Sequence, residues 1–293
     1  MNTDAKLKIQ ELLQAYCRGF ESQTKASKTL HDVSSATISQ VLNNKWEQLA
    51  DKMWLNIGKQ IGFEISIWNH VPTYNYKLIK GLLADAKSMS RVHAITGGAG
   101  WGKDTAARDF YCENPEVYLI NCWDFNRRYF LTQLLRKMGK NTNGSIPDLV
   151  ERVVAEINRT KKPLIILNEA DKLSDQVLYF FITIYNLCED KCGIVMLATN
   201  NLDDRLTRGV ERQKRGYPEI FSRLGSRFIK IRRPSKTDIT AICSANGVTD
   251  ALQISEIINS CDGDLRRAKK LIQNKSAAAK KTNTETEEAE LLG

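Results

Sequence analysis

The segment Gly97 to Thr105 has residue types and a spacing that suit the binding of a phosphate chain. It fits the pattern G-x-x-x-x-G-K, with Lys103 in the seventh position. Glycines let the backbone curl so that its N–H groups face a phosphate, and a lysine ammonium neutralises the charge of the outer phosphates. We therefore expect this segment to bind ATP through Gly97, Gly98, Ala99, Gly100, Trp101, Gly102, Lys103, Asp104 and Thr105.

Asp104 and Asn168 depart from the magnesium-binding pattern of phosphate loops. A Ser or Thr is expected at position 104 and an Asp at position 168, which ends the apolar run LIILN. In phosphate-loop proteins the side chains at both positions contact the same ion. We therefore hypothesise that the carboxylate has moved from position 168 to position 104. Asp104 would supply the anionic contact to Mg²⁺, directly or through water, while Asn168 would hold a metal-bound water. The alternative is a damaged ATPase that binds nucleotide and hydrolyses it slowly or not at all, because Asp104 repels the phosphates.

Glu169 follows Asn168 directly and is the candidate base that orients water on the γ-phosphate. These groups need strands to position them. Short apolar runs predict strands at 92–96, 117–121, 164–168, 193–199 and 228–231. Helical patterns fill most of the gaps, and this alternation is typical of a doubly wound α/β domain.

The chain divides into five predicted regions. A helical head is followed by a linker that carries a glycine and a proline, an α/β ATPase domain, a helical lid and a disordered tail of low complexity. Their predicted ranges are 1–61, 62–76, 77–234, 235–275 and 276–293. We expect the helix that leads into the ATPase domain at 77–89.

Residues 25–46 predict a helix-turn-helix, with helices at 24–30 and 36–43 and Ser34 or Ser35 as a cap. The predicted core is apolar and comprises Leu30, Val33, Ile38, Val41 and Leu42. The polar residues that would face DNA are Ser35, Thr37, Gln40 and Asn43. The head is only modestly basic, so a helical protein-docking module stays open as the alternative.

The whole chain of 293 residues carries a formal net charge of +9, which favours a polyanionic partner such as double-stranded DNA. Two basic clusters of the ATPase domain would track a phosphate backbone without reading bases. Their members are Arg127, Arg128, Arg136 and Lys137 after the second strand, and Arg205, Arg208, Arg212 and Lys214 further on. A solvated loop is the alternative for any one of them.

Composition also limits the setting of the protein. The sequence has no run of 18 apolar residues, and its polar start is unlike a secretory signal, so we expect no membrane partner. The seven cysteines are scattered and form no zinc-binding set. We expect reduced thiols in the cytoplasm of a bacterial host cell.

The order of these pieces resembles the AAA+ ATPases. A glycine loop, an acidic strand, Thr199-Asn200-Asn201, the segment 221–228 and the segment 263–266 follow one another as in that family. The resemblance implies a polar sensor at Asn200 or Thr199, close to the γ-phosphate, and a restraint of Glu169 by Asn121. The arginines that it implies are Arg266, on the phosphates, and Arg227 or Arg223, reaching a neighbouring subunit's nucleotide.

The head, linker, compact AAA+ domain and short lid together resemble the transposition ATPases of the phage Mu B type. This resemblance implies ATP-dependent, largely sequence-non-specific binding of DNA by a homo-oligomer that forms a helical filament. It also implies selection of target DNA and activation of a transposase, which in turn promotes hydrolysis. Two alternatives stay open: a helicase-loader or initiator-like AAA+ ATPase, and a DNA-binding regulator with a vestigial phosphate loop.

Overall fold

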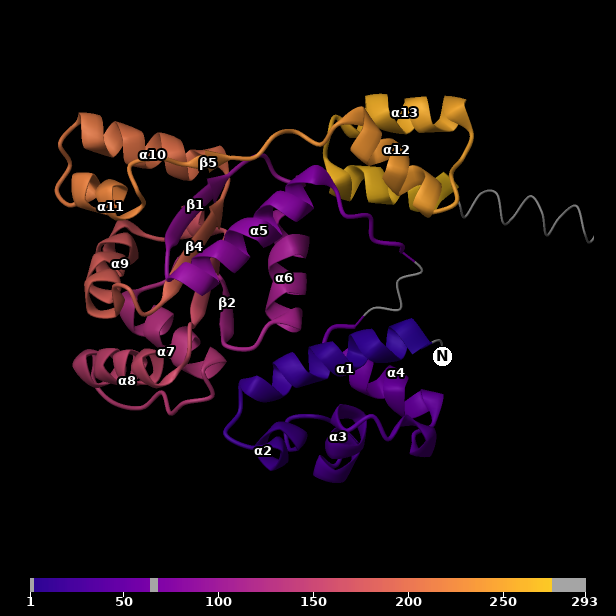
Figure 1. Ribbon diagram of the computed structural model, residues 1–293, viewed down its shortest axis with the longest axis horizontal. Coiled ribbons are helices and arrows are strands. Elements are labelled where there is room, and N and C mark those ends of the chain that lie inside the picture. The colour runs from indigo at the N-terminus through magenta and orange to yellow at the C-terminus, as the bar shows by residue number, and fades with distance from the viewer. Residues whose placement is uncertain (1–2, 64–67, 276–293) are drawn as a thin grey trace, which may run out of the picture.

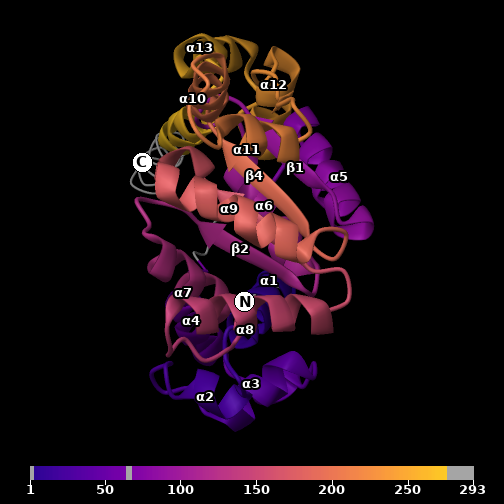
Figure 2. The same ribbon diagram turned by 90° about the vertical axis from the view of Figure 1, so that its left-hand side faces the viewer.

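The computed structural model describes residues 3–63 and 68–275. A helical head, a sheet with helices on both faces, and a small helical lid follow one another along the chain (Figures 1 and 2). The predicted tail, 276–293, and residues 64–67 of the predicted linker lie outside the described residues. No described helix is long and apolar enough to cross a membrane.

The sheet of the described residues has five parallel strands in the order β2-β3-β4-β1-β5. Every residue of the central strands β3 and β4 is buried, which is why both are continuous apolar runs in the sequence. All the predicted strands are present, although β5 has only two residues, which pair with Ile95 and Thr96. The strands are β1 (Val92–Thr96), β2 (Val117–Asn121), β3 (Leu164–Asn168), β4 (Gly193–Ala198) and β5 (Ile229–Lys230).

Two hydrophobic clusters cover the two faces of this sheet, as expected for a doubly wound domain. One face packs against α5 (Tyr74–Met89) and α6 (Lys103–Glu113). The other face is covered by α7 (Arg127–Lys137), α8 (Ile146–Arg159), α9 (Asp175–Cys188), α10 (Asn200–Glu211) and α11 (Tyr217–Arg223). Helix α6 follows β1 through the loop 97–102, so its amino end lies at the carboxyl end of that strand.

Helix α5 begins at Tyr74, three residues before the predicted start at 77. The Thr73 side chain accepts a hydrogen bond from the Tyr76 backbone N–H at 3.3 Å and so caps the helix. The end of the predicted linker is therefore already part of the ordered ATPase domain.

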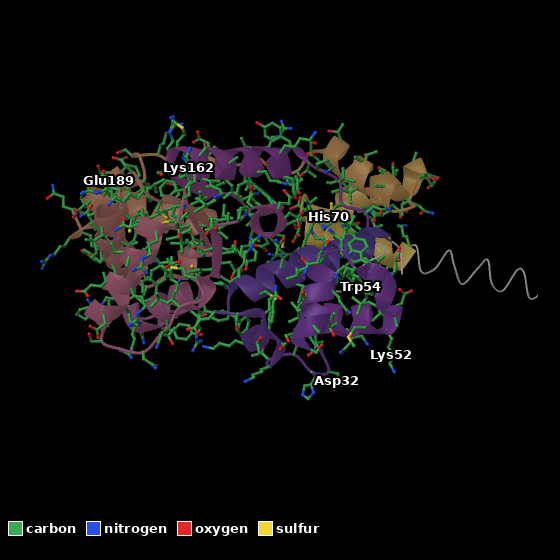
Figure 3. The ribbon with its side chains drawn as sticks, turned by 60° about the horizontal axis from the view of Figure 1, so that its bottom comes forward. Asp32, Lys52, Trp54, His70, Lys162 and Glu189 are labelled. Atoms are coloured by element: carbon green, nitrogen blue, oxygen red, sulfur yellow. The ribbon has the colours of Figure 1, made fainter. Side chains whose placement is uncertain are left out.

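The head contains α1 (Thr3–Arg18), α2 (Gln23–Ser27), α3 (Ser35–Leu42), the short 3₁₀ helix η1 (Trp46–Gln48) and α4 (Asp51–Gln60). The predicted core residues pack together with Trp54, which lies inside the head (Figure 3). Ser34 is the cap of α3, as expected, and accepts from Thr37 N at 3.0 Å. Helix α2 ends earlier than predicted, because the backbone N–H groups of Thr29 and Leu30 make tighter hydrogen bonds to the carbonyls three residues before them.

Helix α1 fixes the head against α6 of the ATPase domain. The Tyr111 hydroxyl donates to the Ala15 carbonyl at 3.0 Å, and the Arg18 guanidinium donates to the Asn114 carbonyl at 2.8 Å. Lys8 also pairs with Asp109 at 3.5 Å. Three contacts therefore join the head to the helix that follows the glycine loop, and Figure 1 shows α3 on the far side of the head from that helix.

The lid consists of α12 (Lys236–Ala245), α13 (Ala251–Cys261) and a further helix over 265–275. Trp68 and Val71, from the predicted linker, pack against its apolar core. The Asn69 backbone N–H also donates to the Asn246 side chain at 2.8 Å. Residues 68–73 are therefore held on the lid and do not form a free spacer.

Candidate nucleotide-binding site

The glycine loop runs from the carboxyl end of β1 to the first turn of α6, as the sequence predicts. Gly100 and Gly102 have positive φ angles of 74° and 91°, a conformation that glycine adopts without steric cost. Gly97 has another role, because a Cβ there would lie 2.3 Å from Ile231 of the sheet edge. The loop therefore lies tightly against the core and places backbone N–H groups at the positive end of a helix.

Lys103 is buried at the start of α6, and its ammonium group turns back onto the loop. It donates to the carbonyls of Gly97 and Gly98 at 2.7 and 2.9 Å. Burial lowers the pKa of Lys103, while the nearby carboxylates of Asp104 and Asp171 act in the opposite direction. The lysine is thus held inside the loop, where an anion would be its natural partner.

The lid touches the loop directly. The Leu265 backbone N–H donates to the Gly100 carbonyl at 3.0 Å, and Arg266 pairs with Asp104 at 2.5 Å. A Cβ on Gly100 would lie only 1.9 Å from an Asp264 oxygen, so glycine is needed for this approach as well as for the turn. The lid segment 263–266 and the loop therefore form one continuous surface.

The acidic strand end brings Asn168 and Glu169 to the same place. Asn168 is 7% exposed, and its Nδ2 donates to the Asn121 side-chain oxygen at 3.0 Å. Asn121 was expected to restrain Glu169, and this expectation is wrong: the neighbouring strand register pairs it with Asn168. Glu169 has a left-handed φ of 57° at the start of the 3₁₀ helix η2 (Ala170–Lys172) and pairs with Lys172 at 2.6 Å.

Thr199, at the end of β4, lines the cavity, whereas Asn200 is exposed and does not. The Thr199 hydroxyl donates to the Asp171 carboxylate at 3.0 Å, and the Thr199 backbone N–H donates to the same group at 3.2 Å. The structure therefore favours Thr199 over Asn200 as the polar group close to a bound phosphate. Sequence reasoning missed Asp171, although a second acid three residues after the strand was a visible signal.

A cavity of about 390 Å³ unites these groups. Its polar lining includes Lys103, Asp104, Glu169, Thr199 and Arg266, from four different parts of the chain. It is also lined by residues that were not predicted as site residues, namely Trp68, His70, Val71, Ile242, Leu265 and Lys269.

Trp68, His70 and Lys269 in this lining suit the binding of a planar ring. The Lys269 ammonium lies 5.4 Å from the centre of the Trp68 ring, and His70 lies beside the lid (Figure 3). Burial lowers the pKa of His70, so its imidazole is neutral at pH 7. One cavity thus combines cations suited to phosphates with aromatic and aliphatic groups.

The polar residues of the cavity also fit a magnesium ion that a bound nucleotide would help to hold. Asn168 is one of the residues that line the cavity, and its Oδ1 atom is buried and has no hydrogen-bond partner in the described structure. The carboxylates of Asp104 and Glu169 line the same cavity, and oxygen atoms are the ligands that magnesium prefers. Among the described residues no group of three or more acidic, His or Cys side chains could hold a metal by itself. The phosphates would therefore have to complete the site.

Arg223 and Arg227 are the two arginines expected to reach a neighbouring subunit's nucleotide. Neither lines this cavity, as is needed for a group that acts on another subunit. Arg223 is occupied by Glu219 at 3.2 Å and by the Asn186 side chain at 3.2 Å. Arg227 is exposed, and no ion pair or hydrogen bond of its side chain is found in the part of the chain that the structure describes. The geometry favours Arg227 as the residue available to a second copy.

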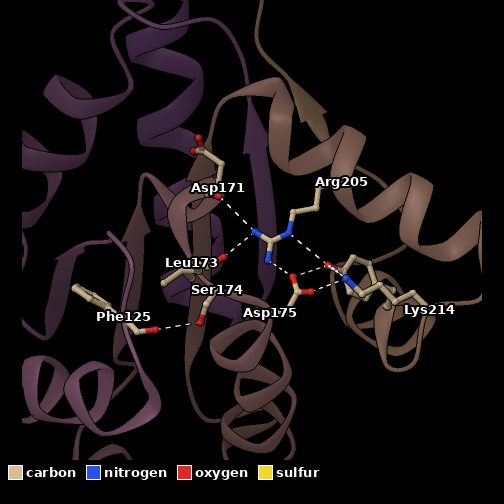
Figure 4. A network of polar contacts seen from close by, with 8 residues as sticks. Phe125, Asp171, Leu173, Ser174, Asp175, Arg205 and Lys214 are labelled. Atoms are coloured by element: carbon tan, nitrogen blue, oxygen red, sulfur yellow. Dashed lines mark hydrogen bonds and ion pairs between the residues drawn. The ribbon is translucent and has the colours of Figure 1, made fainter.

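The prediction that Arg205 contacts DNA requires a correction. Its guanidinium donates to the Leu173 carbonyl at 2.7 Å and is also bonded to Asp175 (Figure 4). Lys214 pairs with Asp175 at 2.5 Å in the same network. Both cations join α10 and the turn after it to the start of α9. Arg205 is therefore structural, and the charge of Lys214 is largely neutralised.

Other predicted DNA-contacting residues of the ATPase domain remain available at the surface. Helix α7 begins with the exposed Arg127 and Arg128, and ends with Arg136 and Lys137. Lys137 is exposed and lies over the Tyr111 ring at 5.8 Å, near the contact with the head. Arg208 and Arg212 are exposed on α10 and at its end.

In the head, Ser35, Thr37, Gln40 and Asn43 lie along α3 and its carboxyl cap, partly or fully exposed. Asn43 donates to the Ser39 hydroxyl at 3.0 Å, and the Thr37 hydroxyl contacts Ser34 at 2.9 Å. The helices and core of the predicted helix-turn-helix are present, while its contact with DNA stays a prediction.

Residues 87–206 match the family model described as AAA domain. Two curated proteins named "ATP-dependent target DNA activator B", from Escherichia phage Mu and Escherichia phage D108, are each 24% identical over 245 residues. The matches cover 80% of this chain and 77% of each relative. The solved structure of Cdc6p from Pyrobaculum aerophilum matches with a TM-score of 0.56 and 17% identity. It covers 76% of this chain and 66% of its own, just under two thirds, and at that identity it shows the fold alone.

These comparisons confirm the predicted fold, an AAA-type α/β domain with flanking helices, and the predicted similarity to the Mu B type.

Proposed function

We propose that this protein binds ATP with Mg²⁺ in the cavity between the glycine loop and the lid, and hydrolyses it. The carrying observation is that Lys103, Glu169, Thr199 and Arg266 converge on one cavity from four separate segments. Lys103 and Arg266 would neutralise the phosphates, and Glu169 would orient the attacking water. The AAA domain match supports an ATPase and leaves the rate of hydrolysis to experiment.

We further propose that the protein binds double-stranded DNA and assembles on it as a filament. Arg127 and Arg128 stand at the exposed start of α7, and Arg227 faces solvent beyond the cavity. A neighbouring copy could bring its nucleotide to Arg227, and successive copies would align their arginines along a phosphate backbone. The printed name of the phage relatives, a target DNA activator, supports a role in selecting target DNA and activating a transposase.

Calorimetry with ATP, in the presence and absence of Mg²⁺, tests the first proposal. We expect micromolar binding by the wild type and at least tenfold weaker binding by Lys103→Ala, which removes a charge-assisted contact. Lys191→Ala, which removes an exposed lysine that does not line the cavity, is the matched control. Wild-type protein that binds no adenine nucleotide under either condition would refute the proposal.

Electron microscopy with ATP and random-sequence duplex DNA tests the second. Continuous filaments support it, closed rings or discrete oligomers indicate a loader or initiator, and isolated dimers indicate a regulator. Binding of DNA should also weaken steeply with salt. Arg127→Ala/Arg128→Ala should reduce the slope of log K against log [salt] by about two, since each phosphate contact contributes about 0.9.

A further inference from the structure

Arg266 and Asp104 form an ion pair that sets the lid against the glycine loop. The guanidinium Nη2 lies 2.5 Å from Asp104 Oδ2, and both residues line the cavity. Position 104 is the place where phosphate loops carry a hydroxyl, which could not hold an arginine through charge. The pair therefore depends on the very substitution that departs from the usual loop pattern.

The surrounding backbone reinforces this position of the lid. Leu265 N–H donates to the Gly100 carbonyl at 3.0 Å, and the Asp264 side chain caps the following helix by accepting from Arg266 N at 2.8 Å. Arg233, on the segment that enters the lid, pairs with Asp262. Arg266 thus lies in the first turn of the helix over 265–275, which these contacts hold at the glycine loop, and its side chain is exposed.

A triphosphate in the cavity would compete for the same guanidinium. If Arg266 moves to a phosphate, the Asp104 carboxylate loses its cation and faces the phosphate charges, which is unfavourable. A magnesium ion would remove that cost, because it offers the carboxylate a new positive partner.

We propose that Asp104 is a positioning residue, which holds the Arg266 guanidinium at the glycine loop and releases it in exchange for Mg²⁺ when a magnesium–nucleotide complex binds. This inference rests on the proposed binding of ATP and names its regulation: Asp104 makes the closure of Arg266 on the nucleotide conditional on the metal.

The experiment measures ATP affinity by calorimetry in excess Mg²⁺ and in excess EDTA. In EDTA, Asp104→Asn should bind ATP about two- to fivefold more tightly than the wild type, the range that an exposed ion pair supports. In Mg²⁺ Asp104→Asn should bind ATP no more tightly than the wild type. The ratio of its affinity in Mg²⁺ to its affinity in EDTA should therefore be lower than that of the wild type. Asp104→Thr, which restores the usual residue of the loop, should reproduce the gain in EDTA.

A double-mutant comparison separates positioning from simple repulsion. In an Arg266→Gln background the gain from Asp104→Asn in EDTA should shrink, because no guanidinium is left to release. An equal gain in both backgrounds would overturn the proposal, since Asp104 would then act only by repelling phosphate. An unchanged or weaker affinity of Asp104→Asn in EDTA would overturn it too.

Glu113→Gln is the matched control for charge, because it removes one ion-paired carboxylate from the same helix. Glu113 pairs with Lys80 outside the cavity. Its affinity should equal that of the wild type in both buffers; a gain in EDTA equal to that of Asp104→Asn would overturn the proposal. If the wild type itself binds no ATP, the proposed function fails; if the wild type binds and Asp104→Asn shows no gain, only this inference fails.

Discussion

The Asp171 carboxylate accepts two hydrogen bonds from Thr199, one from its hydroxyl at 3.0 Å and one from its backbone N–H at 3.2 Å. Asp171 lies two residues after Glu169, so this contact ties the turn that carries the candidate base to the end of β4. One carboxylate therefore holds Thr199 directly and, through the chain, the turn from which Glu169 projects.

Replacing Asp171 should slow turnover more than it weakens binding. Asp171→Ala frees both Thr199 donors and lets the turn at Glu169 shift, and we expect kcat to fall about tenfold or more. Asp171→Asn keeps an acceptor for the hydroxyl and should lose clearly less. Steady-state hydrolysis in the presence of DNA measures both, and equal losses in the two variants would count against a positioning role.

Glu169→Gln should separate binding from hydrolysis. The amide keeps the shape of the side chain and cannot accept a proton, so turnover should fall about 100-fold or more. ATP affinity should stay within about threefold of the wild type, because Glu169 pairs with Lys172 and not with Lys103 or Arg266. Full activity of this variant would exclude Glu169 as the base.

The hypothesis that the magnesium-binding carboxylate has moved from position 168 to position 104 makes its own prediction. Asp104→Thr alone should reduce turnover in Mg²⁺, because the site loses its anionic magnesium ligand. Adding Asn168→Asp should restore it, since a carboxylate then returns at the acidic strand. If the single change already raises activity, the hypothesis is wrong and Asp104 is inhibitory.

Arg227→Ala should lower hydrolysis only in the assembled state. Its exposed side chain lies outside the cavity of its own copy, so ATP binding by the single chain should be unchanged. A mixture of Arg227→Ala and Glu169→Gln should recover activity, because one supplies the base and the other the arginine. Arg223→Ala, which removes a residue already paired with Glu219, should have the smaller effect.

The Asp175 network should stabilise the fold in a pH-dependent way. Burial would raise the pKa of Asp175, but hydrogen bonds from Lys214, Tyr217 and Arg205 outweigh it and hold the pKa well below the ordinary value. Because the folded-state pKa is lowered, the stabilisation is complete above the unfolded-state pKa of about 4 and is lost as the pH falls below it.

Asp175→Ala should therefore lower the free energy of unfolding by about 1–2 kcal/mol at pH 7, a modest value because solvent screens a half-exposed pair. Urea titrations at pH 7 and pH 3 should show the gap between wild type and variant shrinking at the lower pH. Asp204→Ala, which loses only a weak surface pair at 3.8 Å, is the control. A gap that is the same at both pH values would contradict the role of the carboxylate charge.

Local patterns were enough to predict the strands and the glycine loop. β3 and β4 are buried on both faces, so their residues are apolar up to Asn168 at the end of β3, and Gly97 to Lys103 must follow a strand to meet the amino end of a helix. The AAA fold and the lid could be recognised because those signals occur in a fixed order along the chain.

Only the tertiary structure decided which side chains meet. Whether an arginine faces DNA, a neighbour or its own core depends on contacts between distant segments, so Arg205 could not be separated from Arg208 by sequence alone. The same holds for Asn121, whose partner is set by strand register, and for Trp68, which the lid holds at the cavity. Asp104 illustrates both sides of this division. Its unusual identity is visible in the sequence, but its pairing with Arg266, 162 positions away, exists only after folding.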